Sequence, residues 1–299
     1  MNSSPGKSSP GSKLWQAEMP RILIARPTGF CFGVERALRL ARNALRKYPR
    51  VWTYGELVHN PDVLRELQNE GIRIAARISA VRDGAIIIRA HGCPPEVLTQ
   101  CRARGLEIID ATCPYVRRVQ QVARRLAAEG YQVVVVGERN HPEVRAILAA
   151  AAPRALVYSP ARRFRKTEKI GVVAQTTIGR DRLKAAVANL LDFGYTEIRV
   201  FNTICAEVTA RQAAAVRLAK RVEAVIVVGG RNSANTTRLA EIIQPHCRRV
   251  VHITGPAEID PAEWQGFCRI GIAAGASTPA KVVAEVARIL RMSGGRKDE

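Results

Sequence analysis

The sequence predicts an α/β protein built from three similar small units, each with a parallel sheet. Two observations predict this fold. Short β-branched runs alternate with amphipathic helical stretches along the chain, a pattern typical of parallel sheets that are covered by helices. Three segments also share one layout, in which a cysteine precedes a helix and a polar residue follows the next strand, 28 positions after the cysteine. Such a repeat predicts related units around a pseudo-threefold axis.

The alternation begins at residue 21 and continues to residue 291. We expect strands at Ile22–Ala25, Ala85–Arg89, Gln132–Val136, Ile170–Ala174, Ala224–Val228 and Arg269–Ala273. Amphipathic helical stretches are expected at Val34–Lys47, Val116–Glu129 and Arg211–Lys220. We place the units at 21–112, 113–202 and 203–291. Residues 1–20, which are rich in Ser, Pro and Gly, predict a disordered tail, and 292–299 a flexible C-terminus.

The repeat contains three cysteines, Cys31, Cys113 and Cys205. The polar residues 28 positions after them are His59, His141 and Ser233. A later strand of each unit ends at a further polar group, which contains His91, Thr176 or Ser277. Open α/β sheets bind ligands at the carboxyl ends of their strands. The repeat therefore predicts three thiolates close together and ringed by polar side chains.

The other four cysteines lack this context. A lone cysteine is most often a small buried hydrophobic residue, and we interpret Cys101, Cys247 and Cys268 in this way. Cys93 lies near His91, but nothing repeats around it. Seven scattered cysteines without a secretory signal indicate a reducing compartment, so we expect a cytoplasmic protein.

Three converging thiolates suit zinc or an iron–sulfur cluster. A structural zinc site would need a fourth ligand and usually contains closely spaced C-x2-C pairs, which this sequence lacks. A four-iron, four-sulfur (4Fe–4S) cluster with three cysteine ligands leaves one iron open to substrate. Such a cluster can act as a Lewis acid and as an electron donor, and we favour this interpretation.

The polar residues around the cysteines indicate an anion site. They supply many hydrogen-bond donors and no set of carboxylate ligands: His59, His91, His141, Ser233, Asn235 and Ser277. Donors at strand ends and helix N-termini suit phosphate oxygens. Glu143 lies beside the same cavity, where a proton donor could release a hydroxyl group as water. A glutamate favoured by the helix dipole explains this residue equally well when it is taken alone.

The formal net charge of +21 restricts the partners. It attracts nucleic acid, an acidic protein or an anionic substrate. Aromatic residues make up only 5% of the chain, so the argument for nucleic acid depends on charge alone. No dinucleotide-binding fingerprint, P-loop or nucleophile elbow is present. No apolar run approaches the roughly 18 residues that a transmembrane helix needs, so we expect no membrane partner.

These motifs resemble those of the LytB/IspH family, the 4-hydroxy-3-methylbut-2-enyl diphosphate reductases of the non-mevalonate isoprenoid pathway. The resemblance extends from Arg21 to the final helix. The matching segments are Gly29-Phe30-Cys31-Phe32-Gly33-Val34, Val58-His59-Asn60, Ala90-His91-Gly92, Asp110-Ala111-Thr112-Cys113-Pro114, His141-Pro142-Glu143-Val144, Gln175-Thr176-Thr177, Arg231-Asn232-Ser233 with Asn235, and Ala274-Gly275-Ala276-Ser277.

The resemblance implies three α/β domains in a trefoil around a central 4Fe–4S cluster held by the three cysteines. It implies that the diphosphate of a small allylic substrate is bound by His59, His91, Ser233, Asn235 and Ser277, with His141 lining the same pocket. Thr176 and Glu143 would lie near the substrate hydroxyl, and Glu143 would supply the proton. Reductive dehydroxylation would then give isopentenyl and dimethylallyl diphosphate. The electron donor would be an acidic ferredoxin or flavodoxin, which a basic surface attracts.

Three sites depart from the family pattern. Glu207-Val208 stand where the family usually has Ala-Thr, Ala234 where it often has Ser, and Ala146 where it usually has Gly. A carboxylate near a cluster ligand could change the ligand's surroundings. Two alternatives to the reductase stay open. The departures leave open a divergent paralogue that acts as a cluster-based redox sensor. The net charge leaves open a basic nucleic-acid-binding protein with a structural metal.

Overall fold

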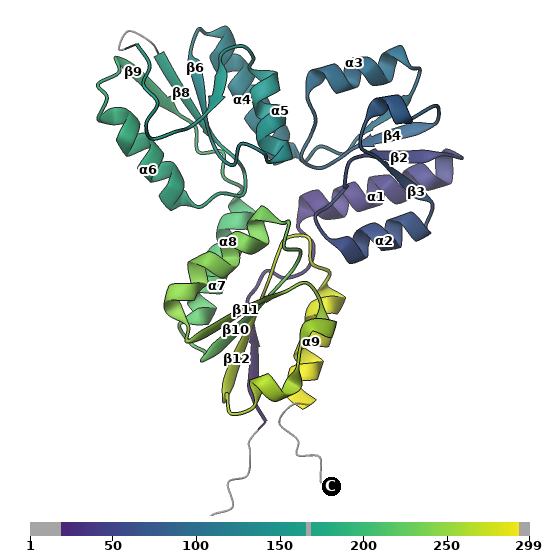
Figure 1. Ribbon diagram of the computed structural model, residues 1–299, viewed down its shortest axis with the longest axis vertical. Helices are drawn as coiled ribbons and strands as arrows, with labels where there is room; N and C mark the ends of the chain where they lie inside the picture. Colours follow the sequence, from purple (N-terminus) through teal and green to yellow (C-terminus); the bar gives the residue numbers. More distant parts are fainter. Residues whose placement is uncertain (1–18, 166–168, 293–299) are drawn as a thin grey trace, which may run out of the picture.

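The three predicted units are present in the computed structural model, which describes residues 19–165 and 169–292. Each unit contains one four-stranded parallel sheet, and the three units surround a common centre like the lobes of a trefoil (Figure 1). The predicted tail and flexible C-terminus lie outside the described residues, apart from residues 19, 20 and 292. Among the described helices, none is long and apolar enough to cross a bilayer.

The first and second units have the same element order. The elements of the first unit are α1 (Phe32–Lys47), β2 (Val51–Tyr54), α2 (Pro61–Asn69), β3 (Ile72–Ala75), β4 (Ala85–Ile88), α3 (Pro95–Ala103) and β5 (Glu107–Asp110). Those of the second are α4 (Pro114–Ala128), β6 (Gln132–Val136), α5 (Pro142–Ala150), β7 (Ala155–Val157), β8 (Lys169–Ala174), α6 (Arg180–Leu191) and β9 (Glu197–Val200). Their strand orders are β3-β2-β4-β5 and β7-β6-β8-β9.

The third unit uses both ends of the chain. Its elements are β1 (Arg21–Ile24), α7 (Ala206–Ala219), β10 (Ala224–Val228), α8 (Ala234–Ile243), β11 (Arg249–Ile253), β12 (Arg269–Ala274) and α9 (Ala280–Met292). The strand order is β1-β12-β10-β11. Short 3-10 turns lie in connections of the first and third units, at Ile78–Ala80, Gln244–His246, Pro256–Glu258 and Pro261–Trp264.

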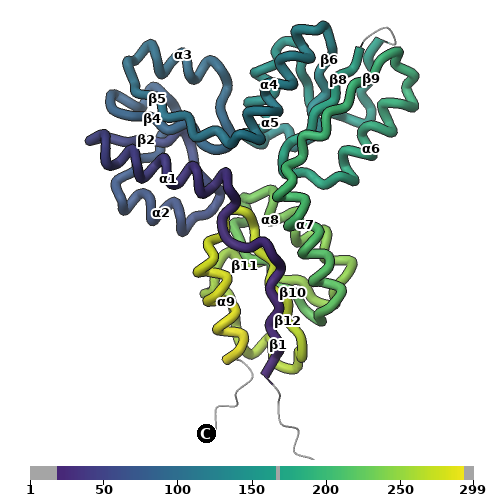
Figure 2. Tube along the Cα trace, turned by 180° about the vertical axis from the view of Figure 1, so that it is seen from behind, coloured from purple at the N-terminus to yellow at the C-terminus, as the bar shows by residue number. Residues whose placement is uncertain are grey.

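The placement of β1 corrects one prediction. We assigned residues 21–112 to the first unit, but β1 pairs in parallel with β12, with Ile22 opposite Ile270. Figure 2 shows the purple β1 in the third unit, beside β12. Strands β5 and β9 hold the same edge position in the other sheets, and each leads to a cysteine and the next unit's first helix. The structural repeat therefore begins at the edge strand that precedes each cysteine. Because the first of these strands, β1, pairs with the third unit, it links the first unit to the third.

Each unit has three layers because its strands are buried on both faces. In the first unit, Ile87 faces α1 and α2, whereas Ile86 and Ile88 face α3. The second and third units repeat this arrangement, with α4 and α5 or α7 and α8 on one face and α6 or α9 on the other. Continuous apolar strands such as β10 are typical of parallel sheets covered by helices.

The three predicted helices are present, but each begins before its expected first residue. They start at Phe32, Pro114 and Ala206. The amphipathic pattern marks only where a helix first packs on a sheet, and the first turn of each helix lies before that point. As a result, the three cysteines lie directly at the helix starts.

Candidate active site

The three repeat cysteines occupy the same structural position. Cys31, Cys113 and Cys205 are the residues immediately before α1, α4 and α7, where the helix N-cap lies. Their backbone N–H groups donate at 2.9 Å to carbonyl oxygens that follow an inner strand of each sheet, those of Ala276, Ala90 and Thr176. The fold thus presents three equivalent thiols at three helix N-termini, as the spacing predicted.

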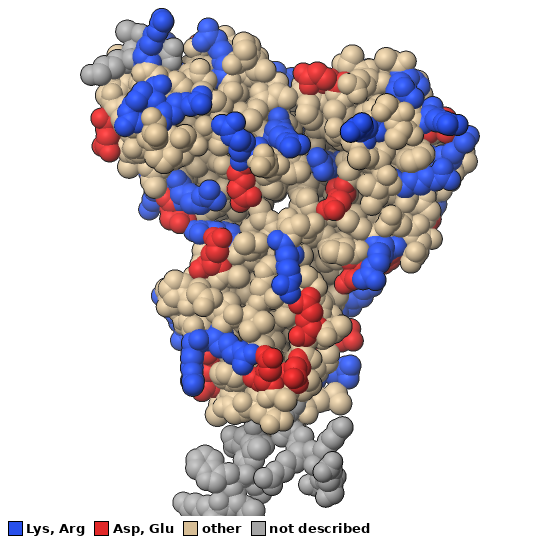
Figure 3. All heavy atoms as spheres, in the orientation of Figure 1, with Lys and Arg blue, Asp and Glu red and all other residues tan. Residues whose placement is uncertain are grey.

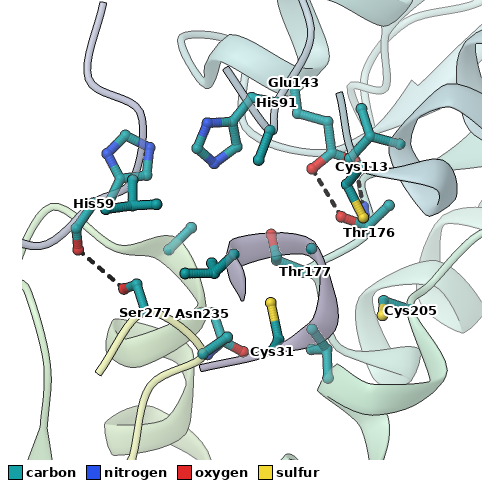
Figure 4. Close-up of a pocket in the computed structure, with 18 of the residues that line it drawn as sticks. Cys31, His59, His91, Cys113, Glu143, Thr176, Thr177, Cys205, Asn235 and Ser277 are labelled. Atoms are coloured by element: carbon teal, nitrogen blue, oxygen red, sulfur yellow. Dashed lines mark hydrogen bonds between the residues drawn. The ribbon is translucent and has the colours of Figure 1, made fainter. Parts of the chain in front are cut away.

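The three thiols open into one pocket. All three are free cysteines, half-buried, and none of their side chains caps its helix. Figure 4 shows their sulfur atoms in the centre and right of the pocket, apart from His59 on the left. Burial raises the pKa of the Cys31 thiol to about 11 and raises that of Cys113. A bound metal would therefore be needed to stabilise the thiolates of Cys31 and Cys113 at neutral pH.

Gly33 leaves space between two of these thiols. A Cβ atom at this position would lie 2.8 Å from the Cys113 Sγ and 3.9 Å from the Cys31 Sγ. Gly33 belongs to α1, so its backbone is helical and does not by itself require glycine. Glycine at this position therefore keeps the space beside the two sulfur atoms free of side-chain atoms.

The other cysteines do not line this pocket in the described part of the chain. Cys101 is fully buried in the core of the first unit, as predicted, and Cys93 packs against the same core. Cys247 is half-buried against the core of the third unit. Cys268 is exposed, so its interpretation as a buried hydrophobic residue was wrong. It lies in the turn before β12, where the sheet has not yet begun.

Three histidines from two units gather in the same pocket. The ring centroids of His59, His91 and His141 lie 4.6 to 6.0 Å apart, and their ring nitrogens are close enough to hold a metal ion. One hydrogen bond favours an anion instead. The Glu143 backbone N–H donates to His141 Nδ1 at 3.2 Å, so a neutral ring carries its proton on Nε2 and donates from that atom.

The other two histidines also have free polar atoms. His59 Nδ1 lies 3.1 Å from a carboxylate oxygen of Glu56, which leaves His59 Nε2 buried without a partner. His91 Nδ1 is likewise buried and unpaired. Burial lowers the pKa of His91 well below its ordinary value and that of His141 to about 4. Both rings are therefore neutral at pH 7.

Further polar side chains reach the pocket from the third unit. Ser233 caps α8, and Asn235 lies in the first turn of this helix. Both amide atoms of the buried Asn235 side chain lack a hydrogen-bond partner. The Ser277 hydroxyl donates to the His59 carbonyl at 3.1 Å. This bond joins the third unit to the first and leaves the Ser277 oxygen as an acceptor.

Asn60 is a site-building residue that the sequence analysis missed. It caps α2 as His141 caps α5 and Ser233 caps α8, and it also donates to the Ser277 carbonyl at 2.9 Å. In the first unit, the residue equivalent to His141 and Ser233 is therefore Asn60. His59 lies one position before it. Asparagine before a proline-started helix is a capping signal that the sequence already contained.

Glu143 and Thr176 form the acidic part of the pocket. The Thr176 N–H donates to Glu143 Oε1 at 2.7 Å, and Thr176 Oγ1 donates to Oε2 at 2.8 Å. Glu143 is only 1% exposed, and burial raises its pKa to about 7 although both hydrogen bonds favour the carboxylate. A glutamate placed only to interact with the helix dipole would lie at the surface, so this burial favours a chemical role.

All predicted site residues line this one pocket. They are Cys31, His59, His91, Cys113, His141, Glu143, Thr176, Cys205, Ser233, Asn235 and Ser277. Val208 and Ala234, two of the departures from the family pattern, line it as well. Ala146 does not, because it is fully buried in α5. The pocket therefore joins free thiols, anion-binding donors and a buried carboxyl group.

Comparisons with known proteins extend over almost the whole chain. The family model described as LytB protein matches residues 22–291. A 4-hydroxy-3-methylbut-2-enyl diphosphate reductase of Geobacter metallireducens is 41% identical over 273 residues, which are 90% of this chain and 96% of the relative. The enzyme of that name from Geobacter sulfurreducens is 43% identical over 268 residues, which are 89% of this chain and 95% of the relative.

Two solved structures are also similar. The E-1-hydroxy-2-methyl-but-2-enyl-4-diphosphate reductase of Plasmodium falciparum has a TM-score of 0.85 and 27% identity, over 90% of this chain and 87% of that chain. An (E)-4-hydroxy-3-methyl-but-2-enyl diphosphate reductase, described as the terminal enzyme of the non-mevalonate pathway, has a TM-score of 0.68 and 38% identity. That similarity covers 92% of this chain and 100% of the other.

Proposed function

The chain belongs to the LytB protein family, and we propose that it reduces 4-hydroxy-3-methylbut-2-enyl diphosphate to isopentenyl and dimethylallyl diphosphate. One observation carries the proposal. A single pocket joins three equivalent free thiols, unpaired anion-binding donors and a buried carboxyl group with a pKa of about 7. Relatives that carry the name of this activity cover about nine-tenths of the chain.

The residues present fit a 4Fe–4S cluster. Cys31, Cys113 and Cys205 would hold it, because their thiols are free, lie at equivalent positions and line one pocket. Gly33 leaves space beside the first two of these thiols. Three helix N-termini meet there, and their partial positive charge stabilises a negatively charged group. When bound, such a cluster supplies electrons and, at the iron without a cysteine ligand, a Lewis acid.

The donors at the other end of the pocket would bind the diphosphate. Buried polar groups normally have hydrogen-bond partners, and leaving one unpaired costs about 1–3 kcal/mol. Asn235 has two unpaired atoms, and His59 and His91 have one each. Phosphate oxygens would accept hydrogen bonds from the Asn235 amide nitrogen, from the His141 Nε2–H and from His91 when its proton lies on Nδ1. His59, whose Nδ1–H donates to Glu56, lines the same end of the pocket. The Ser233 and Ser277 hydroxyl groups lie at the same end.

Glu143 and Thr176 would manage the proton. Burial raises the pKa of the Glu143 carboxyl group to about 7, so this group can carry a proton near neutral pH. The Thr176 hydroxyl contacts Glu143 and also lines the pocket, so it can orient the substrate hydroxyl. Two electrons and two protons release this hydroxyl as water and place one hydrogen on carbon. Glu143 would supply the proton for the water.

Turnover of the cluster-loaded protein tests the function. The substrate is supplied under anaerobic conditions with a chemical reductant, and both five-carbon diphosphates are expected. Glu143→Gln should lower the product rate at least about a hundredfold, as expected for loss of a general acid, and leave the iron and sulfide contents unchanged. No product from a wild-type protein with a full cluster would overturn the reductase. It would favour the redox sensor, which is supported by the departures Glu207, Val208 and Ala234. The last two of these residues line the pocket.

The nucleic-acid alternative receives no support from the family assignment. On the face seen in Figure 3, Lys and Arg are spread over the three units and interspersed with acidic residues, and no continuous basic stripe crosses this face. A net charge of +21 instead suits an acidic electron donor of the ferredoxin or flavodoxin type.

A further inference from the structure

Glu207 connects the helices that begin at two of the three repeat cysteines. It lies in the first turn of α7, two residues after Cys205. Its Oε2 accepts a hydrogen bond at 3.3 Å from the backbone N–H of Phe32, the residue after Cys31. The starts of α1 and α7 accordingly lie side by side at the centre of the molecule (Figure 2). One carboxylate thus joins the Cys31 helix to the Cys205 helix.

Arg211 fixes this carboxylate in place. It lies one turn further along α7 and donates to Glu207 Oε1 at 2.9 Å. The side chain is only 2% exposed, and a second nitrogen donates to the Pro27 carbonyl at 3.3 Å. A buried guanidinium group needs a nearby carboxylate, because an unpaired buried charge is strongly unfavourable. Two opposite charges are therefore held in fixed positions beside Cys31.

The fold itself does not require this carboxylate. The positions two residues after Cys31 and Cys113 are occupied by Gly33 and Tyr115, which carry no charge. Glu207 is also one of the departures from the family pattern that the sequence shows, and the proposed reaction assigns it no part. It lies beside the sulfur end of the pocket without lining the pocket itself.

We propose that Glu207 and Arg211 form a clasp that positions the Cys31 helix against the Cys205 helix and whose two charges tune the reduction potential of the bound cluster. This inference rests on the proposed function, because it requires a cluster held by these cysteines. Net charge and hydrogen bonds near the sulfur atoms set the potential of such clusters. The Glu207 carboxylate lowers the potential, since negative charge disfavours an added electron, and Arg211 raises it. Glu207 is a positioning residue and does not contact the substrate.

Paired charge removal tests the clasp. Glu207→Gln and Arg211→Gln each remove one charge and keep a side chain that can form hydrogen bonds, and the double variant removes both charges. Glu35→Gln is the matched control, because Glu35 is an exposed acidic residue in the first turn of α1 and faces solvent. The midpoint potential is measured by a redox titration of each cluster-loaded protein, followed by electron paramagnetic resonance, with iron and sulfide quantified.

Opposite shifts are the expected result. Glu207→Gln raises the midpoint potential, Arg211→Gln lowers it, and the double variant lies between them. Glu35→Gln leaves the potential unchanged, because water and salt screen an exposed charge. Should Arg211→Gln fail to fold, Glu207→Asp replaces it as the comparison. This variant retains the charge and keeps the potential closer to wild type than Glu207→Gln does.

Two results would overturn the clasp. One is a shift of the midpoint potential with the same sign in Glu207→Gln and Arg211→Gln at equal cluster content. Such a common shift is expected if both substitutions only disturb the packing around the cluster and their charges have no effect. The other is an unchanged potential in Glu207→Gln. A wild-type protein that turns over substrate but gives either result contradicts the clasp alone. A wild-type protein that binds no cluster contradicts the proposed function as well.

Discussion

At the scale of single residues, the site depends on titratable side chains whose uncharged form is favoured by burial. Glu143, His91 and His141 all carry pKa values shifted toward the uncharged form, and burial is the main cause in each. The carboxyl group can therefore hold a proton at neutral pH while the neighbouring imidazole rings remain neutral. Environments of this kind distinguish proton donors from ordinary surface acids.

A pH profile tests the role of Glu143. The pKa of this group is raised to about 7, and a proton donor acts only in its protonated form. Turnover by the cluster-loaded enzyme should therefore be highest below pH 7 and fall about tenfold per pH unit well above it. The measurement is kcat from pH 6 to 9 with a chemical reductant and constant cluster content. A profile that stays flat across this range in the wild-type enzyme contradicts the assignment.

The sequence predicts eleven residues that line the pocket, but not the contacts between them. The repeat identifies the three cysteines and most of the polar residues, the motif resemblance includes the same residues, and all of them line one pocket. The contact between Glu207 and Phe32 joins residues 175 positions apart and could not be predicted. The Glu207–Arg211 pair has helical spacing, but the burial of Arg211 depends on the loop at Pro27.

At the scale of elements, the site consists of helix starts. The three cysteines stand at the starts of α1, α4 and α7, while Asn60, His141 and Ser233 cap α2, α5 and α8. The same two positions recur in each of the three units, because each unit repeats one order of strands and helices. Helix N-termini concentrate backbone N–H groups and partial positive charge, and this suits both a cluster and a diphosphate.

Gly33→Ala separates the folding of α1 from its role beside the thiols. Alanine favours a helix by up to about 1 kcal/mol over glycine. In the metal-free protein the Cys113 Sγ can rotate away from the added methyl group, whereas the Cys113 Cβ, 3.3 Å from it, must move slightly. A sulfur atom that binds iron cannot rotate away, because the added Cβ would lie 2.8 Å from the observed Sγ position. The gain in helix propensity offsets this small steric cost, so the metal-free variant should have a stability close to that of wild type, but the iron content after reconstitution should fall.

Ala37→Gly, one turn further along α1, is the matched control for Gly33→Ala. Ala37 is fully buried in the core of the first unit and does not line the pocket. This variant should lose stability in urea unfolding and keep its iron. Full iron content in Gly33→Ala would show that the space between the thiols is not needed.

At the scale of the whole molecule, the three units form a closed ring. The sequence predicts their number because the cysteine repeat is visible, but it places β1 in the wrong unit. The reason is physical. Each cysteine follows the edge strand of the preceding unit's sheet, and for Cys31 that strand is β1, which belongs to the third sheet although it lies at the start of the chain. Such a pairing, between residues almost 250 positions apart, leaves no periodic signal.

The charge of the whole molecule predicts how the electron donor binds. With a net charge of +21, an acidic donor protein is attracted over long range, and salt screens this attraction beyond about 10 Å at 0.1 M. The rate constant for reduction by an acidic ferredoxin or flavodoxin should fall steeply as salt is raised. Reduction by a cationic viologen should not fall, since repulsion is screened instead. Equal salt dependence for the two reductants contradicts docking through charge.

The iron content of single cysteine variants tests the account most directly. Cys31→Ala, Cys113→Ala and Cys205→Ala are reconstituted anaerobically beside Cys101→Ala, whose side chain is buried in the core away from the pocket. We expect four iron and four sulfide per wild-type chain, as in a 4Fe–4S cluster. Each of the three variants should lose most of its iron, and Cys101→Ala should keep its full content. A full cluster in any of the three variants, or none in the wild-type protein, contradicts a cluster held by these three cysteines.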